Sequence, residues 1–284
     1  MSDLVAAGRA RLERGWDQPV ELGTVEVAFE ERAVFRSTAP DGRPVVVKVD
    51  TLPSRFHRES AALQSAAAEG VRVPAIVWAE AGRPTILVLE AVDGVSLSAD
   101  SPRNAWSMAG RELRRLHDVA PPPRLPRFDH REASWREFVL WWAGHACEQA
   151  LDSAWLGRAA AQRVRDLMVG TFERMSEPDR RMLHGDLTPP HVLMDVAPMR
   201  VAALIDFGDS GTGDPAWDLI VLTLWRPEML EAVLDGYGTS PELVKHLGFV
   251  GPAYRVLRHL AAAGWLAEHG FDPAKDVEMA IQLS

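Results

Sequence analysis

The period of the hydrophobic pattern changes along the chain, and each change predicts a different kind of element. Leu4, Val5 and Leu12 lie on one side of an opening amphipathic helix. Between residues 20 and 50 the apolar positions alternate instead, which predicts three strands, at residues 25–29, from residue 34, and at residues 45–49. A turn at residues 39–44, which contains Pro and Gly, joins the last two of these strands.

A helix and two further strands complete this first region. Pro53 suits the first turn of a helix and Gly70 the position after its end, so the helix is expected between them. Two more strands are predicted at residues 75–79 and 85–90, on either side of a turn. Three strands, one helix and two strands predict a small antiparallel module.

The remainder of the chain has a helical period. Helices are predicted from residue 105, at residues 135–149 and at residues 155–175. The pattern predicts one interruption, a short strand pair at residues 192–194 and 201–205. Asp214 followed by Pro215 predicts the start of another helix rather than a catalytic group. Because the last strand of the first region ends before Asp93-Gly94, we expect one domain over residues 1–93 and a second over residues 94–284.

Composition and charge narrow the class of protein. The chain has 284 residues, with 31 Lys and Arg against 40 Asp and Glu, for a net charge of −9. Without runs of Lys or Arg it lacks a surface that holds phosphates by counterion release, so no nucleic-acid partner is expected. No apolar run approaches the roughly 20 residues that cross a bilayer. With no signal peptide and a single cysteine, Cys147, the chain is expected in the cytoplasm without a membrane partner.

Two carboxylates flank the predicted strand pair. Asp186, in the run His184-Gly185-Asp186, precedes the first strand, and Asp206 ends the second, so a hairpin would bring both to one end. A general base beside a metal ligand is the chemistry that such a pair indicates. A structural role for either carboxylate alone is the alternative.

Lys48 interrupts the valine run of the third predicted strand. A buried ammonium needs a partner, and Glu59 in the following helix is the candidate. The alternative is a lysine that extends to solvent from an edge strand.

The segments around Asp186 and Asp206 resemble the catalytic and metal-binding motifs of the aminoglycoside phosphotransferase and choline kinase-like family, and they follow each other in the same order along the chain. The segments are Leu-His-Gly-Asp-Leu-Thr-Pro-Pro-His-Val-Leu-Met-Asp at residues 183–195 and Ala-Leu-Ile-Asp-Phe-Gly-Asp at residues 203–209. The resemblance implies a two-lobed, protein-kinase-like α+β fold. Its small N-terminal lobe, with a five-stranded antiparallel sheet and one helix, would bind nucleotide. The larger, mostly helical C-terminal lobe would carry the catalytic and acceptor sites.

The resemblance also implies the cofactors, ATP or GTP with Mg²⁺, and a role for each matching residue. Asp186 would be the general base toward an acceptor hydroxyl, with His184 ordering its loop, and Asp206 would bind the magnesium that bridges the nucleotide phosphates. The remaining implied nucleotide contacts are the Lys48–Glu59 pair at the phosphates, and the backbone of Glu90 and Val92 at the adenine edge.

Two departures from the family pattern stand out. His191 occupies the position of the expected second metal ligand, an Asn, and is predicted either to ligate metal or to support the loop by hydrogen bonds. The turn between the first two strands, residues 29–34, contains no glycine that would let backbone amides approach phosphates. Arg32 in this turn is a candidate phosphate contact, although an exposed arginine is the prediction that we favour.

These observations predict an ATP-dependent small-molecule O-phosphotransferase, with an aminoglycoside-type antibiotic as the candidate acceptor. A metabolite kinase of the same fold and a nucleotide-binding pseudokinase that acts as a binding module are the alternatives. The segment after residue 205 carries 12 acidic and 5 basic side chains, which favours a cationic acceptor. The carboxylates that could form a cation-binding surface are Glu228, Glu231, Asp235, Glu268, Asp272, Asp276 and Glu278.

Overall fold

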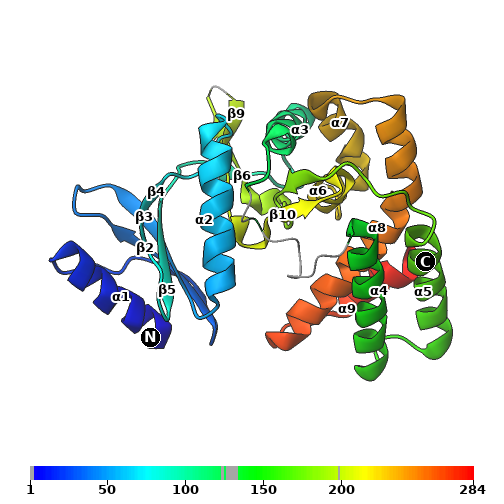
Figure 1. Cartoon of the computed structure of the whole chain (residues 1–284), viewed down its shortest axis with the longest axis horizontal. Helices are drawn as coiled ribbons and strands as arrows, with labels where there is room; N and C mark the ends of the chain where they lie inside the picture. Colours follow the sequence, from blue (N-terminus) through cyan, green and yellow to red (C-terminus); the bar gives the residue numbers. More distant parts are fainter. Residues whose placement is uncertain (1–2, 123–124, 126–133, 198) are drawn as a thin grey trace.

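The structure is a computed structural model that describes residues 3–122, 125, 134–197 and 199–284 (Figure 1). In chain order its helices and strands are α1 (Asp3–Trp16), β1 (Val25–Ala28), β2 (Arg32–Thr38), β3 (Pro44–Asp50), α2 (Pro53–Ala68), β4 (Ile76–Glu80), β5 (Thr85–Glu90), β6 (Val95–Ser96), α3 (Arg103–Asp118), α4 (Trp135–Asp152), α5 (Arg158–Phe172), β7 (Arg181–Leu183), β8 (Val192–Val196), β9 (Met199–Leu204), β10 (Gly211–Gly213), α6 (Pro215–Leu222), α7 (Leu230–Tyr237), α8 (Pro241–Glu268) and α9 (Ala274–Gln282). Short 3₁₀ turns precede β8, follow β9 and precede α7.

The first five strands form one antiparallel sheet in the order β1-β2-β3-β5-β4. Val47 at the centre of β3 is paired with Phe35 of β2 on one side and Val88 of β5 on the other. The five-stranded antiparallel sheet and the mostly helical region that follows it confirm the predicted α+β fold class. The domain boundary between residues 93 and 94 stays a prediction.

The alternating pattern of the strands divides their side chains between two hydrophobic cores. Val45, Val47 and Val49 of β3 are buried in a core with α1, together with Ile86 and Val88 of β5. The intervening residues of β5, Leu87 and Leu89, belong to the larger core that contains α2 and the C-terminal helices. Figure 1 shows α1 and α2 on opposite faces of the sheet. Because side chains alternate, Lys48 lies on the α2 face.

The C-terminal region holds more strand pairing than the sequence pattern predicted. β8 and β9 form the expected hairpin, but β6 adds a third strand to it, and β7 pairs with β10. The expectation of a single strand pair was therefore wrong. Strands of two or three residues, such as Val95–Ser96 and Gly211–Gly213, are too short to show a period of two.

Two further sequence predictions can be compared with the structure. Asp214 caps α6, because its carboxylate accepts a hydrogen bond from the Ala216 N–H at 2.9 Å, so the predicted helix start is confirmed. Within the described part of the chain, no helix is long and apolar enough to cross a membrane.

Candidate active site

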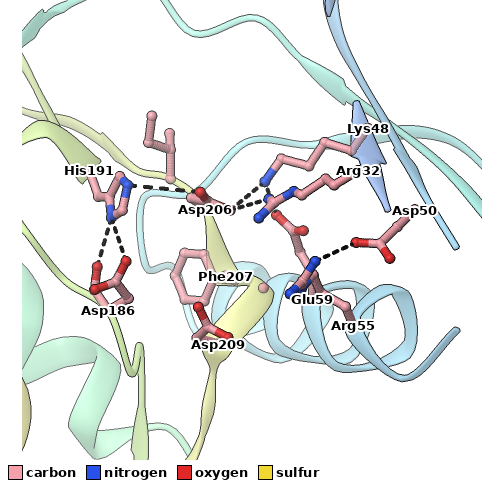
Figure 2. A network of polar contacts seen from close by, with 12 residues as sticks. Arg32, Lys48, Asp50, Arg55, Glu59, Asp186, His191, Asp206, Phe207 and Asp209 are labelled. Atoms are coloured by element: carbon pink, nitrogen blue, oxygen red, sulfur yellow. Dashed lines mark hydrogen bonds and ion pairs between the residues drawn. The ribbon is translucent and has the colours of Figure 1, made fainter. Parts of the chain in front are cut away.

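Lys48, Glu59 and Asp206 form a compact ion-pair cluster where the α2 face of the sheet meets the end of β9 (Figure 2). The Lys48 Nζ lies 2.5 Å from the Glu59 Oε1 and 2.8 Å from the Asp206 Oδ1. Only 11% of the Lys48 side chain and 4% of the Glu59 side chain is exposed. The partner predicted for Lys48 is therefore the one that it contacts, and the lysine does not extend to solvent. Burial lowers the pKa of Lys48, but Asp206 and Glu59 outweigh that effect and raise it.

The backbone and the neighbouring cations together fix the state of Asp206. Its φ of 65° and ψ of 65° place it in the left-handed region, which Asp tolerates better than most residues, between β9 and a short turn. Burial would raise the pKa of its carboxyl group, but Lys48 and Arg32 hold that pKa well below its usual range. Asp206 is thus an ionised carboxylate that keeps 33% of its side chain exposed.

Arg32 contradicts the expectation of an exposed arginine. Its Nη2 lies 2.8 Å from the Asp206 Oδ1, the oxygen that Lys48 also contacts, and only 18% of the side chain is exposed. Burial opposes the charge on Arg32, whereas Asp206 and Glu59 raise its pKa. Arg32 was expected in the turn before the second strand, but it is the first residue of β2. The sequence pattern also gives no information about how far a long side chain reaches across the site.

The loop that carries Asp186 is held by hydrogen bonds from the protein interior. Gly185 has a φ of 88°, a conformation that favours glycine. The Asp218 carboxylate, which is fully buried, accepts hydrogen bonds from the N–H groups of His184 at 2.8 Å and Gly185 at 2.9 Å. The Trp217 Nε1 donates to the Gly185 carbonyl at 2.8 Å. Asp218 therefore positions the loop without reaching a substrate itself.

His184 is fully buried beside Asp186. Its Nε2 donates to the carbonyl of Ile205 at 2.8 Å, and so connects the Asp186 loop to the segment that ends at Asp206. Burial and the neighbouring His191 lower the pKa of His184. These contacts are those of a neutral residue that orders the loop, as the resemblance implies; its role in the reaction stays a prediction.

His191 lies between the two carboxylates in a defined orientation. Its Nδ1 is 2.7 Å from the Asp186 backbone carbonyl, which can only accept, so Nδ1 carries a proton. In the neutral ring the Nε2 then has a free lone pair, and this atom lies 3.8 Å from the Asp206 Oδ2. Figure 2 shows the other edge of the ring, with Nε2, turned toward Asp206.

Five of the eight predicted site residues form one continuous chain of contacts. Beyond Asp206 and His191, the chain reaches Asp186, whose Oδ2 lies 4.0 Å from the His191 Nδ1. The other two members are Lys48 and Glu59. Residues that are far apart in the sequence therefore meet in one place, as the resemblance implies.

Of the other three predicted residues, His184 orders the Asp186 loop as described above, and Glu90 and Val92 lie where the chain leaves the five-stranded sheet. Glu90 is the last residue of β5, and its N–H donates to the Ala75 carbonyl at 2.9 Å. The Ala91 N–H donates to the Pro44 carbonyl at 3.1 Å. Val92 follows and is half-buried. No interaction recorded in the described residues joins Glu90 or Val92 to the Asp186–Asp206 cluster, so their contact with an adenine stays a prediction.

Sequence analysis missed Arg258, which contacts the predicted base. This residue lies on α8, and its Nη2 is 2.5 Å from the Asp186 Oδ1. Its side chain is 16% exposed. Arg258 lies between two helix positions that are fully buried, Leu257 and His259. A basic residue in such surroundings needs a charged partner, and the sequence could have indicated Arg258 on that ground.

The residues present fit a magnesium nucleotide. Among the described residues no group of three or more His, Cys, Asp or Glu side chains could hold a metal ion alone. Mg²⁺, however, is usually bound through one or two carboxylates together with phosphate oxygens and water. The ionised, partly exposed Asp206 can supply that carboxylate, while Lys48 supplies a cation for the phosphates.

The seven acidic residues expected to form a cation-binding surface have other contacts. Glu231 and Asp235 pair with Arg103 on α3, and Asp276 pairs with the buried His259. The remaining contacts are those of Glu228 with Arg226, Glu268 with Gln149, Asp272 with the Ala274 N–H, and Glu278 with Gln282. In the described part of the chain, no hydrogen bond or ion pair connects any of the seven to Asp186.

Comparison with known proteins agrees with this geometry. The sequence matches the phosphotransferase enzyme family over residues 24–260. Streptomycin 3''-kinase of Streptomyces griseus is 29% identical over 196 residues, which make up 61% of this chain and 70% of that protein. The family match includes the segments that carry Lys48, Asp186 and Asp206.

Solved structures share the fold across almost the whole chain. A thermostable mutant of aminoglycoside phosphotransferase APH(4)-Ia in its apo form has a TM-score of 0.75 at 18% identity, and the match covers 97% of each chain. A ternary complex of another mutant of that protein contains ADP and hygromycin B. Aminoglycoside phosphotransferase APH(3'')-Id from Streptomyces rimosus has a TM-score of 0.64 at 22% identity, with 92% of this chain and 99% of that one covered.

Proposed function

This chain belongs to the phosphotransferase enzyme family, and on that premise we propose that it transfers the γ-phosphate of ATP to a hydroxyl group of a small molecule. The observation that carries the proposal is the continuous set of contacts from Lys48 through Asp206 and His191 to Asp186. These contacts support the proposal because they run from a buried lysine, which would meet the phosphates, to a carboxylate that would act as the base. A protein that only bound nucleotide would not need the carboxylate at the second end.

In the proposed reaction the acceptor hydroxyl oxygen forms a bond to the γ-phosphorus. The bond from that phosphorus to the oxygen shared with the β-phosphate breaks, and ADP leaves with that oxygen. The hydroxyl proton passes to Asp186, whose Oδ1 is held by Arg258 and whose Oδ2 remains to accept it. Lys48 neutralises phosphate charge, and Glu59 keeps the ammonium in place.

Asp206 is the proposed magnesium ligand, and His191 is the proposed second ligand from the chain. When bound, the ion would draw charge from the nucleotide phosphates and hold them in place. The Asp186 carbonyl supports His191 in this role because it fixes the proton on Nδ1 and leaves Nε2 free.

The acceptor class is proposed from the relatives rather than from a recognised pocket. Streptomycin 3''-kinase makes an aminoglycoside the first class to test. The local pairing of the acidic residues after Asp206 gives no support to a strongly cationic acceptor, and Arg258 adds a positive charge beside Asp186. These two observations favour a neutral polyol or nucleoside as the second class.

The test is an ADP-release assay with the purified chain, ATP and Mg²⁺. One panel holds aminoglycosides, and a second holds neutral polyols and nucleosides of similar size. We expect acceptor-dependent ADP release with one panel and loss of that release in Asp186→Asn. For a cationic acceptor the apparent affinity should weaken as salt rises, because exposed charges are screened over about 8–10 Å at physiological ionic strength. For a neutral acceptor it should not.

A pseudokinase would give a different pattern. It would bind ATP without releasing ADP faster than the buffer control with any member of either panel. That outcome, with nucleotide binding confirmed by titration, would contradict the proposed transfer and leave a nucleotide-binding module as the function.

A further inference from the structure

The turn between β1 and β2 lacks the glycines of a phosphate-binding loop, and one of its backbone amides already has a partner. The residues from Phe29 to Glu31 include no glycine, so side chains obstruct the approach of phosphate to the backbone. The Phe29 N–H also donates to the Arg32 carbonyl at 2.8 Å, which uses one of the amides that such a loop would offer. Binding of phosphate at this turn therefore needs a side chain.

Arg32 is the first residue after this turn, and its side chain is directed into the site. Figure 2 shows Arg32 and Lys48 approaching Asp206 from the same side. Both cations contact the same oxygen, the Asp206 Oδ1, each at 2.8 Å. The Arg32 side chain is 18% exposed, so most of it contacts protein rather than water.

The turn that precedes Arg32 is held against the C-terminal region. The Phe29 ring lies edge-on to Trp265 at 5.7 Å and to His269 at 4.4 Å between ring centroids. The His269 Nε2 lies 3.3 Å from the Glu31 Oε1. This clasp, made of Phe29, Glu31, Trp265 and His269, fixes the base of the Arg32 side chain relative to Asp206.

The charges of the cluster indicate what Arg32 does when a nucleotide binds. Lys48 has a second carboxylate, Glu59, whereas Asp206 is the one ion-pair partner recorded for Arg32 among the described residues. If Asp206 turns to a metal ion, the guanidinium loses its partner, and a half-buried arginine without a counter-charge is costly. Phosphate oxygens can replace the carboxylate, because the planar fork of arginine binds both groups with two parallel hydrogen bonds.

We propose that Arg32 is a phosphate-binding residue that exchanges Asp206 for the terminal phosphates of the nucleotide, in place of a glycine-rich backbone loop. The inference rests on the proposed use of ATP. It assigns the role of the turn to one side chain, and it makes Arg32 a contact that distinguishes phosphorylated from unphosphorylated nucleosides.

The test compares the binding of ATP with that of adenosine by calorimetry, both with Mg²⁺ present, in the full chain and in Arg32→Ala. The variant should bind ATP about 10-fold more weakly or worse, which is the loss expected for a hydrogen-bonded charge pair. Adenosine, which carries no phosphate, should bind with unchanged affinity. Arg36→Ala is the matched control, because Arg36 lies on the same strand, is exposed, and pairs with Glu26.

Each other outcome has a definite meaning. Unchanged or tighter ATP binding in Arg32→Ala would overturn the inference, since Arg32 would then only neutralise Asp206. Equal losses for ATP and adenosine in both Arg32→Ala and Arg32→Gln would also overturn it by assigning a structural role. If the unaltered chain binds neither ligand, the proposed function itself fails. If it binds both and Arg32→Ala changes neither, the inference fails alone.

Discussion

Arg258 on α8 donates a hydrogen bond to the Oδ1 of Asp186 at 2.5 Å. A side chain from the longest helix of the described chain therefore contacts the candidate base. The pair is half-buried, with 16% of the Arg258 side chain and 29% of the Asp186 side chain exposed. One carboxylate oxygen is thereby fixed, and the other remains to meet an acceptor. We infer that Arg258 positions Asp186.

The first prediction concerns this pair. In Arg258→Ala the carboxylate can rotate away from the acceptor, so kcat should fall by about 10-fold to 100-fold, as is typical when a reacting group is misplaced. The KM for ATP should stay close to its original value, because Arg258 does not contact the Lys48 cluster. Arg258→Lys, which keeps the charge, should recover part of kcat. A loss confined to KM for ATP would show that the pair has another purpose.

Substitutions of Asp186 and Asp206 should affect different quantities, the first kcat and the second the binding of ATP. Asp186→Asn removes the proton acceptor, so kcat should fall by roughly 10²-fold to 10⁴-fold while ATP affinity is retained. Asp206→Ala should instead weaken the binding of ATP with Mg²⁺, because Asp206 is the proposed metal ligand. Steady-state kinetics and nucleotide titration check both. Asp195→Asn, a change on the same hairpin at a residue paired with Arg200, is the control. Full activity in Asp186→Asn would refute this division.

Sequence patterns predicted the fold well because burial on two faces leaves a strong periodic signal. The alternation in β3 puts Val47 and Lys48 on different faces of the sheet. Lys48 therefore faces α2, the helix that carries Glu59. The strands β6, β7 and β10 were missed because two or three residues carry no usable period. For these three strands, the length of the element rather than its importance to the site decided what the pattern detected.

Sequence analysis predicted the site residues that belong to short motifs. It missed those that only the fold brings to the site. His184, Asp186 and Asp206 lie in two short segments that a sequence can identify. Arg258 and the clasp around Phe29 join segments separated by many residues, so no local pattern connects them. Arg32 was named, but its exposure was wrong, because a side chain's direction depends on the partner that it finds.

His191 gives a prediction about metal preference. With Nδ1 donating to the Asp186 carbonyl, the Nε2 can ligate an ion held by Asp206. Manganese accepts imidazole more readily than magnesium does, so the ratio of rates with Mn²⁺ and Mg²⁺ should fall several-fold in His191→Asn. Titration of ATP with each metal should show the same change in affinity. If both ratios are unchanged, His191 only supports the loop.

The clasp between Phe29, Glu31, Trp265 and His269 predicts a pH-dependent contribution to stability. The Trp265 carbonyl raises the pKa of His269 above its ordinary value of 6.5, and Glu31 and Glu268 act in the same direction. A hydrogen bond from the backbone of Glu31 lowers the pKa of that carboxyl below 4.5, with His269 adding to the effect. A raised histidine pKa stabilises the folded chain fully below pH 6.5, and the gain is lost as the pH rises through the folded value.

We therefore expect His269→Ala to lower Tm more at pH 6 than at pH 8.5. The difference should be at most about 3 °C, since partly exposed ion pairs contribute at most about 1 kcal/mol. Glu31 stays ionised at both pH values, so the charge that changes is that of His269. Comparing the loss of Tm at the two pH values therefore separates this charge from the ring contact with Phe29, which the substitution removes at both. His145 stacks on Trp141 and is exposed, so His145→Ala is the matched control for the loss of an imidazole from an aromatic contact. A larger loss at pH 8.5 would contradict the direction of the His269 shift, and equal losses at both values would mean that the clasp is held by its aromatic contacts alone.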